Sequence, residues 1–135
     1  MPYRVLILTS NADDARILHQ ALGNARDGPF DLEDAATLAD GLRRIQHGQI
    51  DAILVDLLLP DSQGLACFDR LHAAARHIPI LTLCELDNEA DAIEAVQRGA
   101  QGWLSKGYFD NYLLPQSLRN IIERMKVERG LYVAR

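Results

Sequence analysis

Short apolar runs alternate with longer amphipathic stretches along the whole chain. We expect the apolar runs to be five strands, at residues 4–8, 30–35, 52–58, 78–84 and 102–106. In the stretch after each strand, apolar residues recur every three or four positions, which predicts a helix. This order of strands and helices is typical of a parallel sheet covered by helices, and it predicts an α/β fold.

Two of the predicted strands differ in their side-chain pattern. Residues 30–35 alternate apolar and polar side chains, as an edge or half-covered strand does. Residues 52–58 are apolar on both faces, which indicates a central position in the sheet. Asp56 is the charged exception in that central strand, and the segment PDSQG at residues 60–64 breaks the strand.

The ends of the first two helices are marked by polar residues. Asn11 is placed to cap the first helix, and Asp13 and Asp14 lie in its first turn, where carboxylates meet the positive end of the helix dipole. Capping is the role that we expect for both carboxylates. Thr37 opens the second helix, and Gly48 marks its end.

The fourth and fifth helices are predicted from shorter signals. Asp87 or Asn88 is placed to cap the fourth helix, whose apolar stripe we expect to include Ile93 and Val96. The last helix begins near Pro115, which is tolerated in a first turn. Its apolar residues then repeat at helical spacing.

The composition suits one compact domain. The chain has 135 residues, of which 48% are hydrophobic and 24% charged. Its net charge of −5 and the absence of a Lys or Arg cluster argue against a nucleic-acid partner, which needs a concentrated positive field. No apolar run approaches the ~20 residues of a membrane span. We therefore expect a cytoplasmic protein without a membrane partner.

The two cysteines do not indicate a metal site or a disulfide framework. Cys67 and Cys84 lie 17 positions apart and have no flanking CxxC motif or histidine partner. We expect both to be small buried side chains.

Polar side chains lie at or just after the ends of four of the five predicted strands. They are Thr9 and Ser10, Asp56, Cys84 and Glu85, and Ser105 and Lys106. The carboxyl ends of parallel strands meet at one edge of the sheet, where ligands bind in open α/β folds. A lone aspartate at such an end is most simply a cap for the following loop. A lysine at the same edge favours an anionic phosphoryl site with its counter-charge.

Three segments together resemble the receiver domain of bacterial two-component response regulators, the CheY-like superfamily. They are VLILTSNADDARIL, LVDLLLPDSQGL and AVQRGAQGWLSKG, and the resemblance runs from about Tyr3 to Arg124. It implies a flavodoxin-like, doubly wound sheet of five parallel strands in the order 2-1-3-4-5, with helices on both faces. It also implies that Asp56 is the phosphoacceptor and that Lys106 contacts the phosphoryl group.

The metal site that the resemblance implies is incomplete. Receivers bind Mg²⁺ through an acidic pair after the first strand, through the phosphoacceptor and through a backbone carbonyl. The corresponding positions here are Thr9 and Ser10 for the acidic pair, Asp56, and the carbonyl of Leu58. Mg²⁺ prefers carboxylate oxygens, so we expect weak or absent metal binding. Asp13 and Asp14 lie four positions further on, and replacing the acidic pair is the less favoured alternative to their capping role.

Cys84 and Trp103 occupy the two positions that change with activation in receivers. Cys84 stands where the family has a Ser or Thr that hydrogen-bonds the phosphoryl group, and a thiol is a poorer donor. Glu85 follows it and is either a repelling charge or a solvated loop side chain. Trp103 matches the aromatic switch of the fifth strand, although it is equally a partly buried core aromatic. These departures favour an atypical receiver with little or no phosphorylation.

The resemblance also implies partners and domain boundaries. A histidine kinase or a phosphotransfer protein would be the phosphodonor, and the chain itself would not be an enzyme. Residues 1–124 would form the receiver, and residues 125–135 a helical extension leading to an output domain. The face made by the fourth helix, fifth strand and fifth helix would mediate signalling and a homodimer.

Two other functions remain open from the residues alone. An aspartyl-phosphate hydrolase of the haloacid dehalogenase type needs a second aspartate two residues after the nucleophile, and that position is Leu58. A flavodoxin-like domain that binds FMN or another small ligand needs a glycine-rich loop after the first strand. The segment TSNADD contains no glycine and carries two carboxylates that would repel a phosphate.

Overall fold

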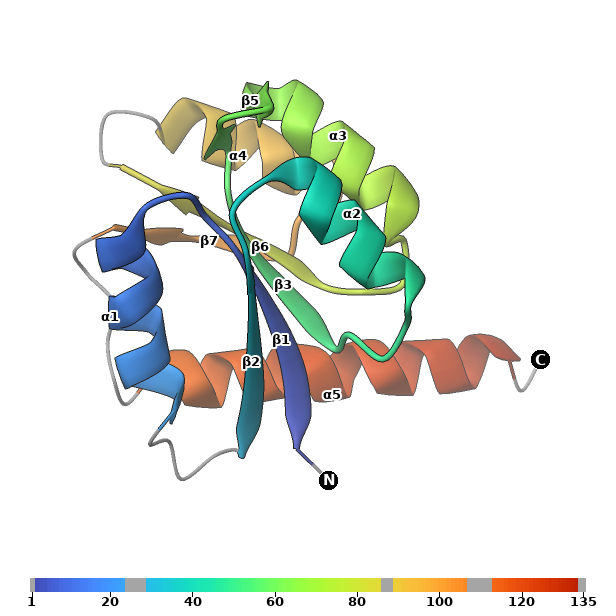
Figure 1. Ribbon diagram of the computed structural model, residues 1–135. Coiled ribbons are helices and arrows are strands. Elements are labelled where there is room, and N and C mark those ends of the chain that lie inside the picture. Colours follow the sequence, from blue (N-terminus) through green and yellow to red (C-terminus); the bar gives the residue numbers. More distant parts are fainter. Residues whose placement is uncertain (1, 24–28, 86–88, 107–112, 134–135) are drawn as a thin grey trace.

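Five parallel strands form the centre of the computed structural model, which describes residues 2–23, 29–85, 89–106 and 113–133 (Figure 1). The strands, from one edge of the sheet to the other, are β2 (Phe30–Ala35), β1 (Tyr3–Leu8), β3 (Ala52–Asp56), β6 (Ile80–Cys84) and β7 (Gly102–Ser105). Every pair of neighbours in this sheet is parallel. The order and direction confirm the predicted 2-1-3-4-5 sheet.

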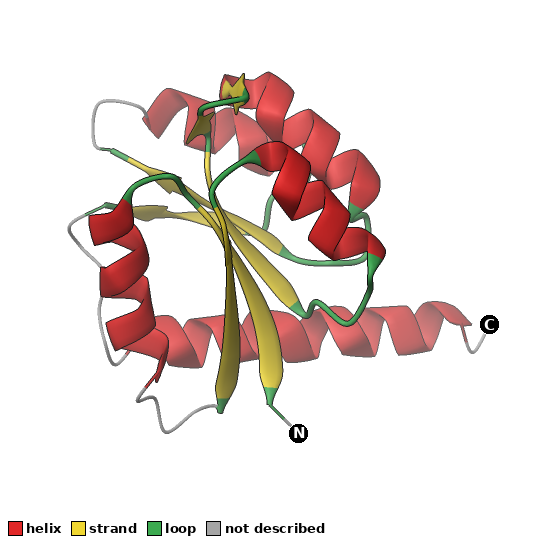
Figure 2. Ribbon diagram, viewed as in Figure 1, coloured by secondary structure: helices red, strands yellow, loops and turns green. Residues whose placement is uncertain are grey.

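Helices cover both faces of the sheet, as predicted (Figures 1 and 2). They are α1 (Ala12–Gly23), α2 (Leu38–Gln46), α3 (Gly64–Ala74), α4 (Glu89–Gln97) and α5 (Leu113–Val133). Leu18 of α1 and Leu118 of α5 belong to one core cluster, whereas Leu38 of α2 and Phe68 of α3 belong to the cluster on the other face. Because alternate residues of β1 and β3 enter the two clusters, both strands are apolar on both faces.

The central strand is shorter than predicted. β3 ends at Asp56, and the next residues form a small antiparallel hairpin of β4 (Leu58–Leu59) and β5 (Ser62–Gln63). The N–H of Gly64 donates to the carbonyl of Leu57 at 2.6 Å and closes this loop, and Gly64 has a φ of +70°, which glycine tolerates better than other residues. The apolar run continues past the strand because Leu57 and Leu59 are themselves buried.

The predicted buried stripe of α4 is wrong. Ala92 and Ala95 face the core and are fully buried, whereas Ile93 and Val96 are 46% and 37% exposed. Small alanine side chains let the helix approach the sheet closely, and the larger apolar side chains then point outward. The predicted capping residues of this helix, at 87 and 88, lie outside the described residues.

The other predicted helix ends agree with the structure to within two residues. Asn11 and Thr37 cap α1 and α2 through their side-chain oxygens. α2 ends at Gln46, before Gly48, and α5 begins at Leu113, so that Pro115 lies within its first turn. Cys67 and Cys84 are both buried and free, as expected.

Candidate functional site

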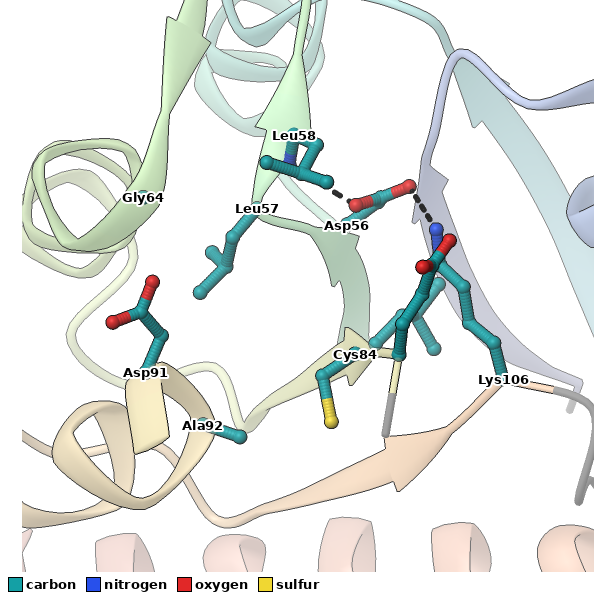
Figure 3. A pocket seen from close by; sticks show the side chains of 10 residues that line it. Asp56, Leu57, Leu58, Gly64, Cys84, Asp91, Ala92 and Lys106 are labelled. Carbon is teal, nitrogen blue, oxygen red and sulfur yellow. Dashed lines mark hydrogen bonds and ion pairs between the residues drawn. The ribbon is translucent and has the colours of Figure 1, made fainter. Parts of the chain in front are cut away.

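Asp56 ends the most deeply buried strand of the sheet and is itself only 3% exposed. Its carboxylate is held at both oxygens. Oδ1 accepts the backbone N–H of Leu58 at 3.0 Å, and Oδ2 accepts the hydroxyl of Thr9 at 3.3 Å and the ammonium of Lys106 at 2.7 Å (Figure 3). A buried carboxylate needs such partners because leaving it unpaired away from water is costly. The apolar strand therefore presents a fixed and neutralised carboxylate at the edge of the sheet.

Lys106 reaches the site from the end of β7. Its backbone N–H donates to the carbonyl of Cys84 at 2.8 Å, which extends the pairing between β6 and β7 by one residue. The side chain is 12% exposed, and its ammonium lies 2.7 Å from Asp56 and 3.1 Å from Asp14. Burial lowers the pKa of Lys106, but hydrogen bonds and charge from the two aspartates outweigh it, so the pKa is raised. The sequence prediction that Lys106 and Asp56 meet is confirmed.

Asp14 is a site residue for which the sequence analysis favoured a capping role. The expected capping role is wrong, because Asn11 Oδ1 accepts both first-turn N–H groups, from Asp13 at 2.9 Å and Asp14 at 3.1 Å. The Asp14 side chain points instead into the site and is 13% exposed. Its spacing was the available signal, because Asp14 lies four residues before the buried Leu18, on the stripe that faces the core.

The two positions that match the family's acidic pair behave differently. Thr9 is 7% exposed, and its hydroxyl donates to Asp56 and accepts the N–H of Asn11 at 3.1 Å. Ser10 is exposed. The structure therefore brings Thr9 into the site as a neutral hydrogen-bond donor.

The side chains at this edge do not fit the Mg²⁺ ion that the family implies. Within residues 2–23, 29–85, 89–106 and 113–133, no group of three Asp, Glu, His or Cys side chains is placed to hold a metal ion. Asp14 and Asp56 face the same point, but the ammonium of Lys106 already lies between them. Leu58, whose carbonyl is the other predicted ligand, donates its backbone N–H to Asp56.

A pocket of about 70 Å³ opens beside Asp56, between the ends of β3 and β6 and the start of α4 (Figure 3). Cys84 and Glu85 line it, and Asp91 lies across it from Lys106. Burial, followed by the negative charge of Glu89, raises the pKa of the Cys84 thiol, so that it stays protonated and donates weakly. The volume suits a few water molecules or a phosphoryl-sized group and is far below the ~300–1,000 Å³ of pockets for cofactors such as FMN.

Trp103 lies on β7, where it pairs in register with Thr82, and its side chain is 39% exposed. It does not line the pocket. The position predicted for the aromatic switch therefore lies on the surface of the last strand.

The comparisons with known proteins agree with this geometry. The family profile of the response regulator receiver domain matches residues 5–126. The response regulator MprA of Mycobacterium sp. (strain KMS) is 25% identical over 131 residues, which is 96% of this chain and 55% of that protein. The swarming motility regulation protein RssB of Serratia marcescens is 31% identical over 97 residues, or 72% of this chain and 41% of that protein. The chain therefore belongs to the receiver family of two-component response regulators.

Solved structures show the same fold. The receiver domain of an HD domain-containing protein from Pseudomonas fluorescens Pf-5 has a TM-score of 0.83 at 22% identity, covering 96% of this chain and 93% of that chain. NtrX from Brucella abortus has a TM-score of 0.87 at 21% identity, covering all of this chain and 30% of that one. The chain spans about half the length of the curated relatives it matches. Among the described residues, no helix is long and apolar enough to cross a membrane.

Proposed function

We propose that this chain is an atypical receiver, in which Asp56 is the phosphoacceptor position and Lys106 the group that contacts the phosphoryl oxygens. The observation that carries the proposal is the 2.7 Å pair between Lys106 and Asp56 at the carboxyl edge of the sheet. The pair joins the ends of two strands, β3 and β7, so a change in charge at Asp56 acts on both.

Phosphorylation of Asp56 is slow or absent in this proposal. Phosphoryl transfer depends on electrostatic stabilisation of the transferring oxygens, which weakens when positive charge at the site is already neutralised. Lys106 is shared between two carboxylates. Cys84, at the switch position, offers a thiol in place of a hydroxyl. Mg²⁺ is weakly bound or not bound.

The output surface in this proposal is the outer side of α4, β7 and α5. Ile93, Val96 and Trp103 are 46%, 37% and 39% exposed there, and Leu113 at the start of α5 is 54% exposed. Large exposed apolar side chains on neighbouring elements favour a protein partner. We assign this surface to a homodimer interface. The family resemblance implies the same face, formed by the fourth helix, the last strand and the last helix.

The phosphodonor would be a histidine kinase or a phosphotransfer protein, and the location would be the cytoplasm. The domain itself would be a signalling module and not an enzyme. Residues 1–124 form the receiver in this proposal. Residues 125–135 are a helical extension toward an output domain, and α5 runs without a break across that boundary to Val133. The greater length of the curated relatives supports this division.

Trp103 is the single tryptophan of the chain and lies on β7, the strand that leads to Lys106, so its fluorescence can report a change at the site. Its fluorescence is recorded during a titration with Mg²⁺, with and without beryllofluoride, which mimics the phosphorylated aspartate. The proposal predicts little change at millimolar Mg²⁺. A saturating change that is lost in Asp56→Asn would show that the site is an ordinary metal-dependent receiver site.

A further inference from the structure

Two buried carboxylates share one ammonium at the edge of the sheet. Lys106 Nζ lies 2.7 Å from Asp56 Oδ2 and 3.1 Å from Asp14 Oδ2, and the three side chains are 12%, 5% and 13% exposed. Lys106 directly follows β7, Asp56 ends β3, and Asp14 lies in the first turn of α1, so at least 42 residues of chain separate any two of them. A cation between two carboxylates is the arrangement that a bound metal ion usually provides.

In the part of the chain that the structure describes, Asp14 forms its ion pair with Lys106. Its buried Oδ2 atom lies 3.1 Å from the Lys106 ammonium, and that ammonium and the positive end of α1 balance its charge. The side chain of the neighbouring Asp13 is 83% exposed, and its carboxylate lies 3.8 Å from the i+3 side chain of Arg16. Two consecutive aspartates of one helical turn therefore have opposite environments, which makes Asp13 a matched control.

We infer that Lys106 is the resident cation of this site and that Asp14 is a positioning residue, which holds the ammonium against Asp56 in place of a divalent metal. The inference rests on the proposed function only in taking Asp56 as the functional carboxylate. It adds that α1 is coupled to the site through Asp14, and that the ammonium itself keeps a metal out.

The inference predicts what happens when the ammonium is removed. In Lys106→Met, Asp14 and Asp56 face each other without a cation, which lowers stability in EDTA because two like charges are buried together. Mg²⁺ or Ca²⁺ can then enter between the two carboxylates, since both ions bind carboxylate oxygens. Binding to the folded state alone raises the melting temperature Tm. The variant should gain a metal response that the natural chain lacks.

The experiment measures Tm by circular dichroism in EDTA, in millimolar MgCl₂ and in millimolar CaCl₂. We expect an unchanged Tm for the natural chain and a rise of several degrees with metal for Lys106→Met. The rise should disappear in Lys106→Met with Asp14→Asn, which leaves one carboxylate, and should persist in Lys106→Met with Asp13→Asn. A saturable rise in the natural chain, no rise in Lys106→Met, or the same rise with and without Asp14 would each overturn the inference.

A second measurement does not require the Lys106 variant to fold. In the natural chain labelled with ¹⁵N-lysine, NMR should show a protected ammonium signal for Lys106, because its protons are held by two buried carboxylates. Asp14→Asn should broaden or shift this signal, and Asp13→Asn should leave it unchanged. An unaltered signal in Asp14→Asn would contradict the inference. Neither measurement uses a phosphodonor, so its failure is distinct from a failure of the proposed phosphoacceptor role.

Discussion

Restoring an acidic residue at position 9 tests how the site balances its charges. Thr9 is buried, and its hydroxyl lies 3.3 Å from Asp56 Oδ2, so the carboxylate of Thr9→Asp would lie close to that of Asp56. Ser10 is exposed, so Ser10→Asp adds the same charge at the surface and serves as the control.

The expected loss of stability follows from the distance between the charges. Two like charges about 4 Å apart repel by about 4 kcal/mol at an effective dielectric constant of about 20. Lys106 offsets part of this repulsion, which leaves a loss of about 2 to 4 kcal/mol in EDTA for Thr9→Asp. For a domain of this size, 1 kcal/mol corresponds to about 4 °C in Tm, so Tm should fall by about 8 to 16 °C. Ser10→Asp should stay within about 0.5 kcal/mol of the natural chain.

The assay is thermal unfolding of both single variants and the double variant, with EDTA or with millimolar MgCl₂. The double variant supplies the carboxylates that Mg²⁺ prefers, and we expect the metal to recover most of the lost Tm. An unchanged Tm of Thr9→Asp in EDTA would refute the charge argument. A fall in Tm without recovery by Mg²⁺ would show that the acidic pair is not the limiting defect and would point to the Lys106 ammonium, to Cys84 or to Glu85.

Three further predictions concern the fold and the surface. The hydrogen bond from Arg44 lowers the pKa of Glu33 from its ordinary value of 4.5. The ionised Glu33 therefore stabilises the fold fully above pH 4.5, and this stabilisation is lost as the pH falls through the lower pKa of the folded state. Glu33→Gln should flatten this acid dependence of Tm. Ala95→Leu should lower the free energy of unfolding in urea by about 1 to 3 kcal/mol, because Ala95 is fully buried on the core side of α4. An unchanged urea midpoint would count against that packing. Val96→Glu should lower dimer affinity in light scattering, and a natural chain that is monomeric at every concentration would remove the dimer from the account.

The sheet could be predicted because its signal is local. Each strand is a short apolar run, and only a parallel sheet with helical crossovers accommodates five such runs separated by helices. The meeting of Asp56 and Lys106 followed from the same logic, since both residues end strands of one sheet. Neither conclusion needed a side-chain packing detail.

The features that were missed depend on which side of a helix faces the core. In α4, two alanines are buried and the larger Ile93 and Val96 are exposed, so a rule that buries the largest apolar side chains chose the wrong face. In α1, Asp14 lies on the buried stripe, but its charge and first-turn position suggested a cap. Asn11 fills that role and leaves Asp14 for Lys106.

The hairpin after Asp56 was missed for a different reason. Leu57 and Leu59 continue the apolar run of β3, yet the chain leaves the sheet at Asp56 because Leu58 N–H turns back to its carboxylate. The apolar pattern cannot separate a strand residue from a buried loop residue. The same hydrogen bond also holds the Asp56 carboxylate in place at the end of the strand.

The most direct test of the central claim is the rate at which Asp56 is phosphorylated by a small donor. The natural chain is incubated with acetyl phosphate and millimolar MgCl₂, and intact-mass spectrometry follows the mass added by one phosphoryl group, with Asp56→Asn as the control. Because Lys106 is held by Asp14 and Asp56, we predict slow labelling that never approaches one phosphoryl group per chain. Rapid labelling to one group per chain, dependent on Mg²⁺ and absent in Asp56→Asn, would contradict the account.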